Sequence, residues 1–196
     1  MYVAWGVPTL ILVSVIGYFA GRSAGGAVAA STSDTSPPIV APFANGGGGG
    51  AAPDISNMSP RERASRLYDR IMRYAEEGKR DSAQFFAPMA LSSFELLGAE
   101  LDTDARYDYG RVASETGNLQ IAAAQADTIL QKSPTHLLGL ALSARAATLK
   151  GDTGAASKTW KAFLSTRDVE LKKALPEYQM HAADIEQATR LAQAGK

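Results

Sequence analysis

With 196 residues, the chain is long enough for one modest domain with appended segments, and its 20 basic and 20 acidic side chains leave no net charge to attract nucleic acid or an anionic surface. The absence of cysteine excludes disulfides, zinc–thiolate centres and thiol nucleophiles. Only two of the charged side chains, Arg22 and Asp34, precede Asp54, so the part of the chain that can fold begins in the mid-fifties.

The first expected element is a transmembrane helix within residues 1–22. Residues 3–20 carry no charged side chain, and as a helix they would extend about 27 Å, close to the thickness of the hydrocarbon core. Gly17 and Gly21 have the spacing at which small residues let a second membrane helix approach closely. A cleaved secretory signal is the alternative, but no Lys or Arg precedes the apolar segment, which favours a retained anchor in the lipid bilayer.

Arg22 gives the sequence's indication of membrane orientation. It follows the apolar segment, whereas no basic residue precedes it, so the positive-inside rule favours a cytoplasmic domain, with a periplasmic domain as the alternative. We therefore expect a single-pass protein of a bacterial inner membrane. Residues 23–57 are rich in Gly, Pro and Ser, and we expect them to form a flexible linker with a root-mean-square reach of about 30 Å.

Residues 58–196 are expected to form an all-α domain, because no segment shows a strand pattern. A clear helix start lies at its beginning. Ser59 is placed to cap the helix, Pro60 occupies the first helical position, and Glu62 can complete a capping box. Gly78 supplies the stop signal.

The next signal is a pattern of residues that repeats at a spacing of 34 residues. Gly117 recurs as Gly151 and Ala122 as Ala156, and each glycine is expected to end the first helix of a helical pair. Self-similarity at this period is typical of stacked helical hairpins. On these residues, the segment from about 64 to 166 resembles tetratricopeptide (TPR) repeats.

The resemblance implies a short α-solenoid of about three helical hairpins followed by a capping helix. Gly110 and Ala144 occupy equivalent positions at which the family carries small residues where helices cross. Pro88 falls inside the expected second helix, where it should produce a kink. Residues 176–194 have the pattern of one longer amphipathic helix, with Tyr178 among the residues available for the core.

A TPR-like array implies a concave, partner-binding groove made by the first helices of its hairpins. Carried over by position, this groove presents Tyr68, Met72, Tyr107, Arg111, Leu142 and Arg145. Aromatic and arginine side chains are frequent interface anchors. The alternative is that the tyrosines pack between helices and the arginines form ordinary helical pairs with neighbouring acidic residues such as Glu115.

The histidines do not suggest catalysis or metal binding. His136 lies at a helix entry, where we expect a capping or solvated role. His181 has Glu177 and Asp184 at helical spacing, which predicts ordinary surface pairing. No pattern supplies a nucleophile, a base and an orienting group together, so we expect no catalytic, metal-binding or cofactor-binding residues.

These observations predict a non-enzymatic, membrane-anchored scaffold or assembly element that binds other proteins, such as membrane proteins or subunits of a membrane complex. The alternative is a constitutive accessory subunit of a large membrane complex, of respiratory or photosynthetic type, held by its transmembrane helix and an ordered linker. A third hypothesis is a soluble secreted adaptor, whose mature chain would start near Ala30 after signal cleavage.

Overall fold

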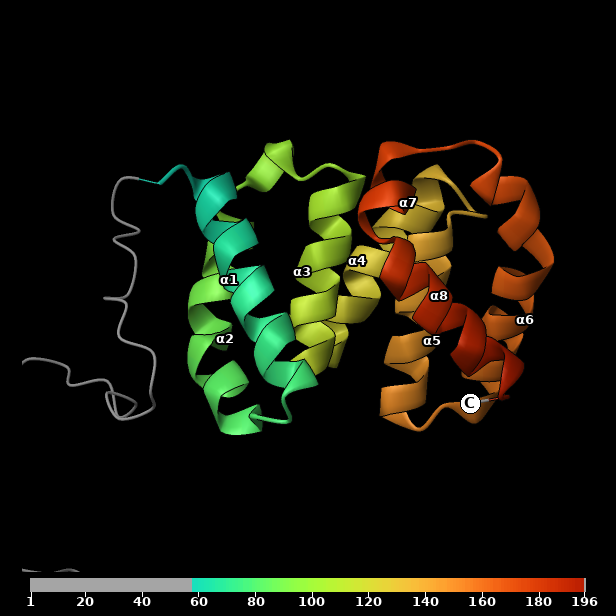
Figure 1. Ribbon diagram of the computed structural model, residues 1–196, viewed down its shortest axis with the longest axis horizontal. Helices are drawn as coiled ribbons and strands as arrows, with labels where there is room; N and C mark the ends of the chain where they lie inside the picture. The colour runs from blue at the N-terminus through green and yellow to red at the C-terminus, as the bar shows by residue number, and fades with distance from the viewer. Residues whose placement is uncertain (1–57, 196) are drawn as a thin grey trace, which may run out of the picture. The chain divides into compact units, whose positions relative to one another are not determined.

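The computed structural model describes residues 58–195, and this part of the chain is entirely helical, as expected (Figure 1). Its α-helices are α1 (Pro60–Glu76), α2 (Arg80–Glu95), α3 (Thr103–Glu115), α4 (Leu119–Lys132), α5 (Leu137–Lys150), α6 (Thr153–Leu171), α7 (Pro176–Met180) and α8 (Ala182–Gln193), with a 3₁₀ turn at Gly98–Glu100. The expected anchor at 1–22, with Gly17 and Gly21, and the expected linker at 23–57 lie outside the described residues. Among the helices described, none is both long and apolar enough to cross a bilayer.

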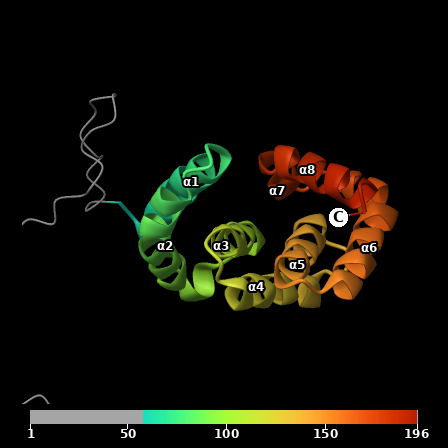
Figure 2. The same cartoon turned by 90° about the horizontal axis from the view of Figure 1, so that it is seen from below.

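The helices form consecutive hairpins that stack side by side. Helix α1 packs on α2, α3 on α4, and α5 on α6, and neighbouring hairpins meet through α2 with α3 and α4 with α5. Viewed from below, α2, α4 and α6 follow the outside of an arc, whereas α3 and α5 lie inside it (Figure 2). Helices α1 and α8 stand at the two ends of the arc and face each other across α3.

Local sequence signals set the start of the domain. The Ser59 hydroxyl accepts a hydrogen bond from the backbone N–H of Glu62 at 3.3 Å, and the Ser59 N–H donates to the Glu62 carboxylate at 2.9 Å. These reciprocal bonds confirm the predicted capping box. In the next helix, Pro88 lies inside α2 as predicted, and the helix continues beyond it to Glu95.

Glycine ends the first helix of each hairpin. Gly78, Gly117 and Gly151 have φ angles of +70°, +81° and +78°, a left-handed conformation that residues with a Cβ rarely adopt. The residue after each glycine bonds back into the helix; for example, the N–H of Asn118 donates to the carbonyl of Ala113 at 2.7 Å. These bonds satisfy helix carbonyls that would otherwise have no partner. The prediction that Gly117 and Gly151 end equivalent helices is therefore confirmed.

Small residues allow the close helix contacts of the core. A Cβ atom added to Gly110 on α3 would lie 2.2 Å from the Cδ2 atom of Leu142 on α5, so glycine is needed for this approach. Ala122, Ala144 and Ala156 are likewise buried where the hairpins pack together. The small residues identified in the sequence thus occupy interior positions of the stack.

The C-terminal segment departs from the single helix that was predicted for residues 176–194. It divides into α7 and α8, and His181 stands between them with φ −104° and ψ 29°. Tyr178 packs into the core as expected, but its hydroxyl also accepts from the N–H of Leu137 at 3.1 Å and donates to Glu170 at 3.0 Å. This buried tether fixes α7 against α5 and α6, whereas α8 packs on α6 and α5. Separate attachments of the two halves explain why the helix is broken.

Candidate functional site

An open cleft of about 540 Å³ lies between α1 and the α7–α8 segment, with α3 at its base. Helix α1 contributes mainly Tyr68, Asp69, Met72 and Glu76. Helix α3 contributes Asp104, Asp108, Arg111 and Glu115. The remaining wall includes Arg145 from α5 and Met180, His181 and Asp184 from the C-terminal segment. The cleft therefore collects side chains from helices that are distant in the sequence.

The residues predicted for the groove divide into two groups. Four of the six line the cleft, namely Tyr68, Met72, Arg111 and Arg145. The other two are buried: Tyr107 is 1% exposed and Leu142 is 0% exposed. Leu142 fills the space beside Gly110, and the Tyr107 ring packs edge-on against the His181 ring at 4.7 Å. Tyr107 and Leu142 therefore support the base of the cleft and do not line it.

The two arginines of the cleft already have acidic partners within the domain. A terminal nitrogen of Arg111 lies 3.5 Å from Glu115 on the same helix and 3.6 Å from Asp184 on α8. Arg145 forms an ion pair with Glu115, across the gap between α5 and α3. The helical pair with Glu115 follows from the sequence spacing, whereas the Asp184 contact depends on the tertiary fold. Neither arginine presents an unpaired charge to a ligand.

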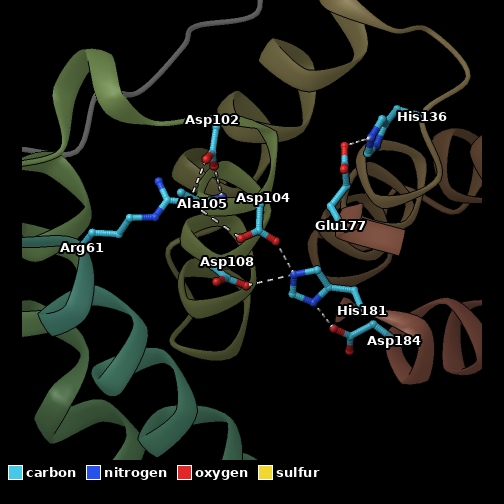
Figure 3. A network of polar contacts seen from close by, with 9 residues as sticks. All are labelled: Arg61, Asp102, Asp104, Ala105, Asp108, His136, Glu177, His181 and Asp184. Carbon is cyan, nitrogen blue, oxygen red and sulfur yellow. Dashed lines mark hydrogen bonds and ion pairs between the residues drawn. The ribbon is translucent and has the colours of Figure 1, made fainter. Parts of the chain in front are cut away.

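His181 joins the C-terminal segment to α3 through a network of carboxylates (Figure 3). Its Nε2 atom lies 2.9 Å from Asp104 and 3.5 Å from Asp108, and its Nδ1 atom lies 3.3 Å from Asp184. Burial alone would lower the pKa of His181, but the hydrogen bonds to Asp104 and Asp184 and the charge of Asp108 raise it to about 9. The ring is therefore cationic at neutral pH.

The prediction of ordinary surface pairing for His181 is wrong. The residue is only 9% exposed, and of its two expected partners only Asp184 is within contact distance of the ring. Glu177 turns instead toward His136, whose Nε2 atom lies 3.3 Å away (Figure 3). Asp104, the strongest partner of His181, is 77 positions away in the sequence. No local spacing could have indicated that contact.

His136 also differs from its predicted role. It stands at the start of α5, but its side chain makes no capping hydrogen bond and is 3% exposed, so it is not solvated. Its ring packs against the ring of Tyr178, with centroids 4.9 Å apart. Burial lowers the pKa of His136, despite its contact with Glu177. His136 is thus a neutral packing residue beside the α7 tether.

Asp108 is the most weakly bonded of the three carboxylates around His181. Its side chain is 14% exposed, and its Oδ1 atom accepts no hydrogen bond from the described residues. Burial raises the pKa of Asp108 to about 7; nearby His181 opposes this rise, whereas Asp104, Asp184 and Asp69 add to it. This oxygen is buried, and it faces the Nε2 atom of His181 at 3.5 Å without a hydrogen bond.

Asp104, Asp108 and His181 also form the group best placed to hold a metal ion among the described residues. One ligand atom from each lies within 4.8 Å of the others, and carboxylate oxygen and imidazole nitrogen are common ligands of divalent cations. The surrounding carboxylates raise the pKa of His181 to about 9, so a metal ion would have to displace the proton from this ring. The arrangement therefore matches an internal ion-pair network at neutral pH.

Comparisons with protein-family models, with curated proteins and with solved structures found no match to this chain. The geometry of the cleft and the chemistry of its residues are accordingly the basis for assigning a function.

Proposed function

We propose that the helical domain is a non-enzymatic protein-binding module, and that a segment of a partner protein enters the cleft between α1 and α8. The observation that carries this proposal is the convergence of Tyr68, Met72, Arg111 and Arg145 on one open cleft. These side chains come from three helices. Tyrosine is enriched among residues that dominate binding energy, and the two arginines, held by Glu115 and Asp184, shape the wall of the cleft. An open trough bordered by a helix of 17 residues suits an extended or helical peptide segment.

We further propose a TPR-like solenoid as the architecture. Its support is the equivalent left-handed glycine at the end of α1, α3 and α5, two of these glycines being 34 residues apart. The proposal includes a membrane anchor within residues 1–22 and a linker at 23–57, which would hold the domain within a few nanometres of a bilayer. The partner would then be a membrane protein or a subunit of a membrane complex.

Site-specific photo-crosslinking in the full chain tests the binding mode. A photoreactive side chain at Ser65, an exposed position on the cleft, should capture the partner in solubilised membranes of the cells that make the protein. The same group at Lys158, exposed on α6 and outside the cleft, is the control and should capture none of it. Mass spectrometry of the Ser65 product identifies the partner and the crosslinked segment.

A cleft-filling variant makes the test decisive. Ala183→Trp places a large side chain on the exposed rim of the cleft and should abolish the Ser65 crosslink. Ala124→Trp, at an exposed position on α4, is the matched control and should retain it. Equal capture from Lys158, or capture that survives Ala183→Trp, would contradict binding in the cleft. Co-migration at fixed stoichiometry in mild detergent would favour a constitutive accessory subunit over a docking protein.

A further inference from the structure

We infer that the partner segment is cationic and that its Lys or Arg side chains bind the acidic side chains of the cleft. This inference rests on the proposed function and specifies the chemistry of the partner. Its basis is the distribution of charge after internal ion pairs are taken into account. In the described part of the chain, the cleft is lined by six carboxylates and only three cationic side chains.

Each cationic side chain is occupied by a carboxylate of the same cleft. Arg111 and Arg145 both pair with Glu115, and Arg111 also contacts Asp184. His181 pairs with Asp104 at 2.9 Å, as well as with Asp184 at 3.3 Å. Every cationic side chain of the cleft is therefore paired within the domain, which argues against a carboxylate-bearing ligand.

Two carboxylates of the cleft have no internal partner among the described residues. Asp69 and Glu76 are exposed on the α1 wall and form no ion pair or hydrogen bond with the described residues. Asp108 is different, because its buried Oδ1 atom already faces the Nε2 atom of His181 at 3.5 Å. Asp69 and Glu76 face one cleft, so its uncompensated charge is negative and complements a basic segment.

The spacing of the α1 carboxylates indicates how far apart the basic residues of the bound partner segment should be. Asp69 and Glu76 are two helical turns apart, which corresponds to about 10 Å along α1. In a polyproline II segment, side chains three residues apart lie on the same side and are separated by about 9 Å. Met72 lies between these carboxylates and Tyr68 beside Asp69, so the wall also offers apolar and aromatic surface to the alkyl stem of a bound lysine.

Peptide binding to the full chain in mild detergent tests this inference. The probe is a blocked, fluorescent peptide of about 12 residues with lysine at every third position and Leu or Ala between, and its counterpart has glutamate in place of lysine. Fluorescence anisotropy should show binding of the lysine peptide at least about tenfold tighter, and added salt should weaken it. Equal or tighter binding of the glutamate peptide would overturn the inference.

Paired variants separate a cleft interaction from a general effect of net charge. The Asp69→Asn/Glu76→Gln variant should weaken the lysine peptide roughly fivefold. Asp127→Asn/Glu186→Gln removes the same charge from exposed positions outside the cleft and should leave affinity within about twofold. If both double variants weaken binding equally, the attraction is non-specific and the inference fails.

Arg145 provides a test with opposite predicted signs. Arg145→Gln removes one of the two partners of Glu115, which makes the cleft more negative, so the lysine peptide should bind more tightly. If Arg145 instead binds a carboxylate of the partner, this variant should weaken binding of the natural partner. Cleft-specific crosslinking of a neutral or acidic segment would overturn the charge inference and leave the proposed function intact, whereas loss of cleft-specific crosslinking would remove the proposed function itself.

Discussion

Replacing His181 with glutamine should remove a pH-dependent attachment between the C-terminal helices and α3. Glutamine keeps polar hydrogen-bonding groups at the site, but it carries no charge to balance Asp104, Asp108 and Asp184. In the native domain, the folded state raises the pKa of His181 from an ordinary value of 6.5 to about 9. The folded state therefore binds this proton more tightly than the unfolded chain does, and it is stabilised wherever the ring is protonated.

The size of the effect follows from the two pKa values. The stabilisation is fully present below pH 6.5 and is lost as the pH rises through about 9, and the difference between these values corresponds to about 3 kcal/mol. Most of that, about 2.5 kcal/mol, should disappear between about pH 7 and about pH 9.5. Asp108 also has a raised pKa, of about 7. The stability that its bound proton contributes is lost as the pH rises to about 7, so most of this loss occurs below the pH range in which His181 titrates.

Urea unfolding of the full chain in mild detergent, followed by circular dichroism at constant ionic strength, measures this dependence. The free energy of unfolding of the wild-type protein should fall across this alkaline range. The fall in His181→Gln should be smaller and come from Asp108, whose pKa rises further once the charge of His181 is gone. His136→Gln is the control: burial lowers the pKa of His136, so its linkage lies at more acidic pH and the alkaline fall should persist. A flat wild-type curve, or the same fall in His181→Gln, would refute a charged His181 network.

Three further changes address the helix contacts, the tether and the cleft. Gly110→Ala forces a Cβ against buried Leu142 and should destabilise the domain by about 1 kcal/mol after the gain in helix propensity, whereas Gly154→Ala, with no close neighbour, should not lower the urea midpoint. Tyr178→Phe removes a buried hydroxyl with two hydrogen bonds and should cost about 2 kcal/mol; an unchanged midpoint would contradict the tether. The lysine peptide should bind more tightly at about pH 8 than at about pH 6, because the free domain raises the pKa of Asp108 to about 7, and Asp108→Asn should abolish the difference.

Predictions from the sequence were most accurate where one or two neighbouring residues determine the backbone. The capping box at Ser59 and the helix ends at Gly117 and Gly151 depend on hydrogen bonds within a few residues, and the structure has them where expected. The all-helical fold also follows from local patterns repeated along the chain. These features depend little on how the hairpins stack.

The acidic network of the cleft depends on contacts that local spacing cannot reveal. His181 has acidic residues at helical spacing, which suggests a surface pair, but the fold brings it to Asp104 and Asp108 on α3. The break between α7 and α8 has the same origin, because it reflects the tether at Tyr178 and the turn at His181. Amphipathic spacing alone predicts one continuous helix for this segment.

The contact between His181 and Asp104 has a consequence for how the domain unfolds. In a simple stack each hairpin contacts only its neighbours, and the ends can fray independently of the middle. Here the last helices reach α3 directly, 77 positions earlier in the chain, and Asp184 on α8 does the same through Arg111. Opening the C-terminal segment therefore disrupts the central hairpin as well. The helical domain should lose its structure as one cooperative unit, with a single transition in place of stepwise loss of hairpins.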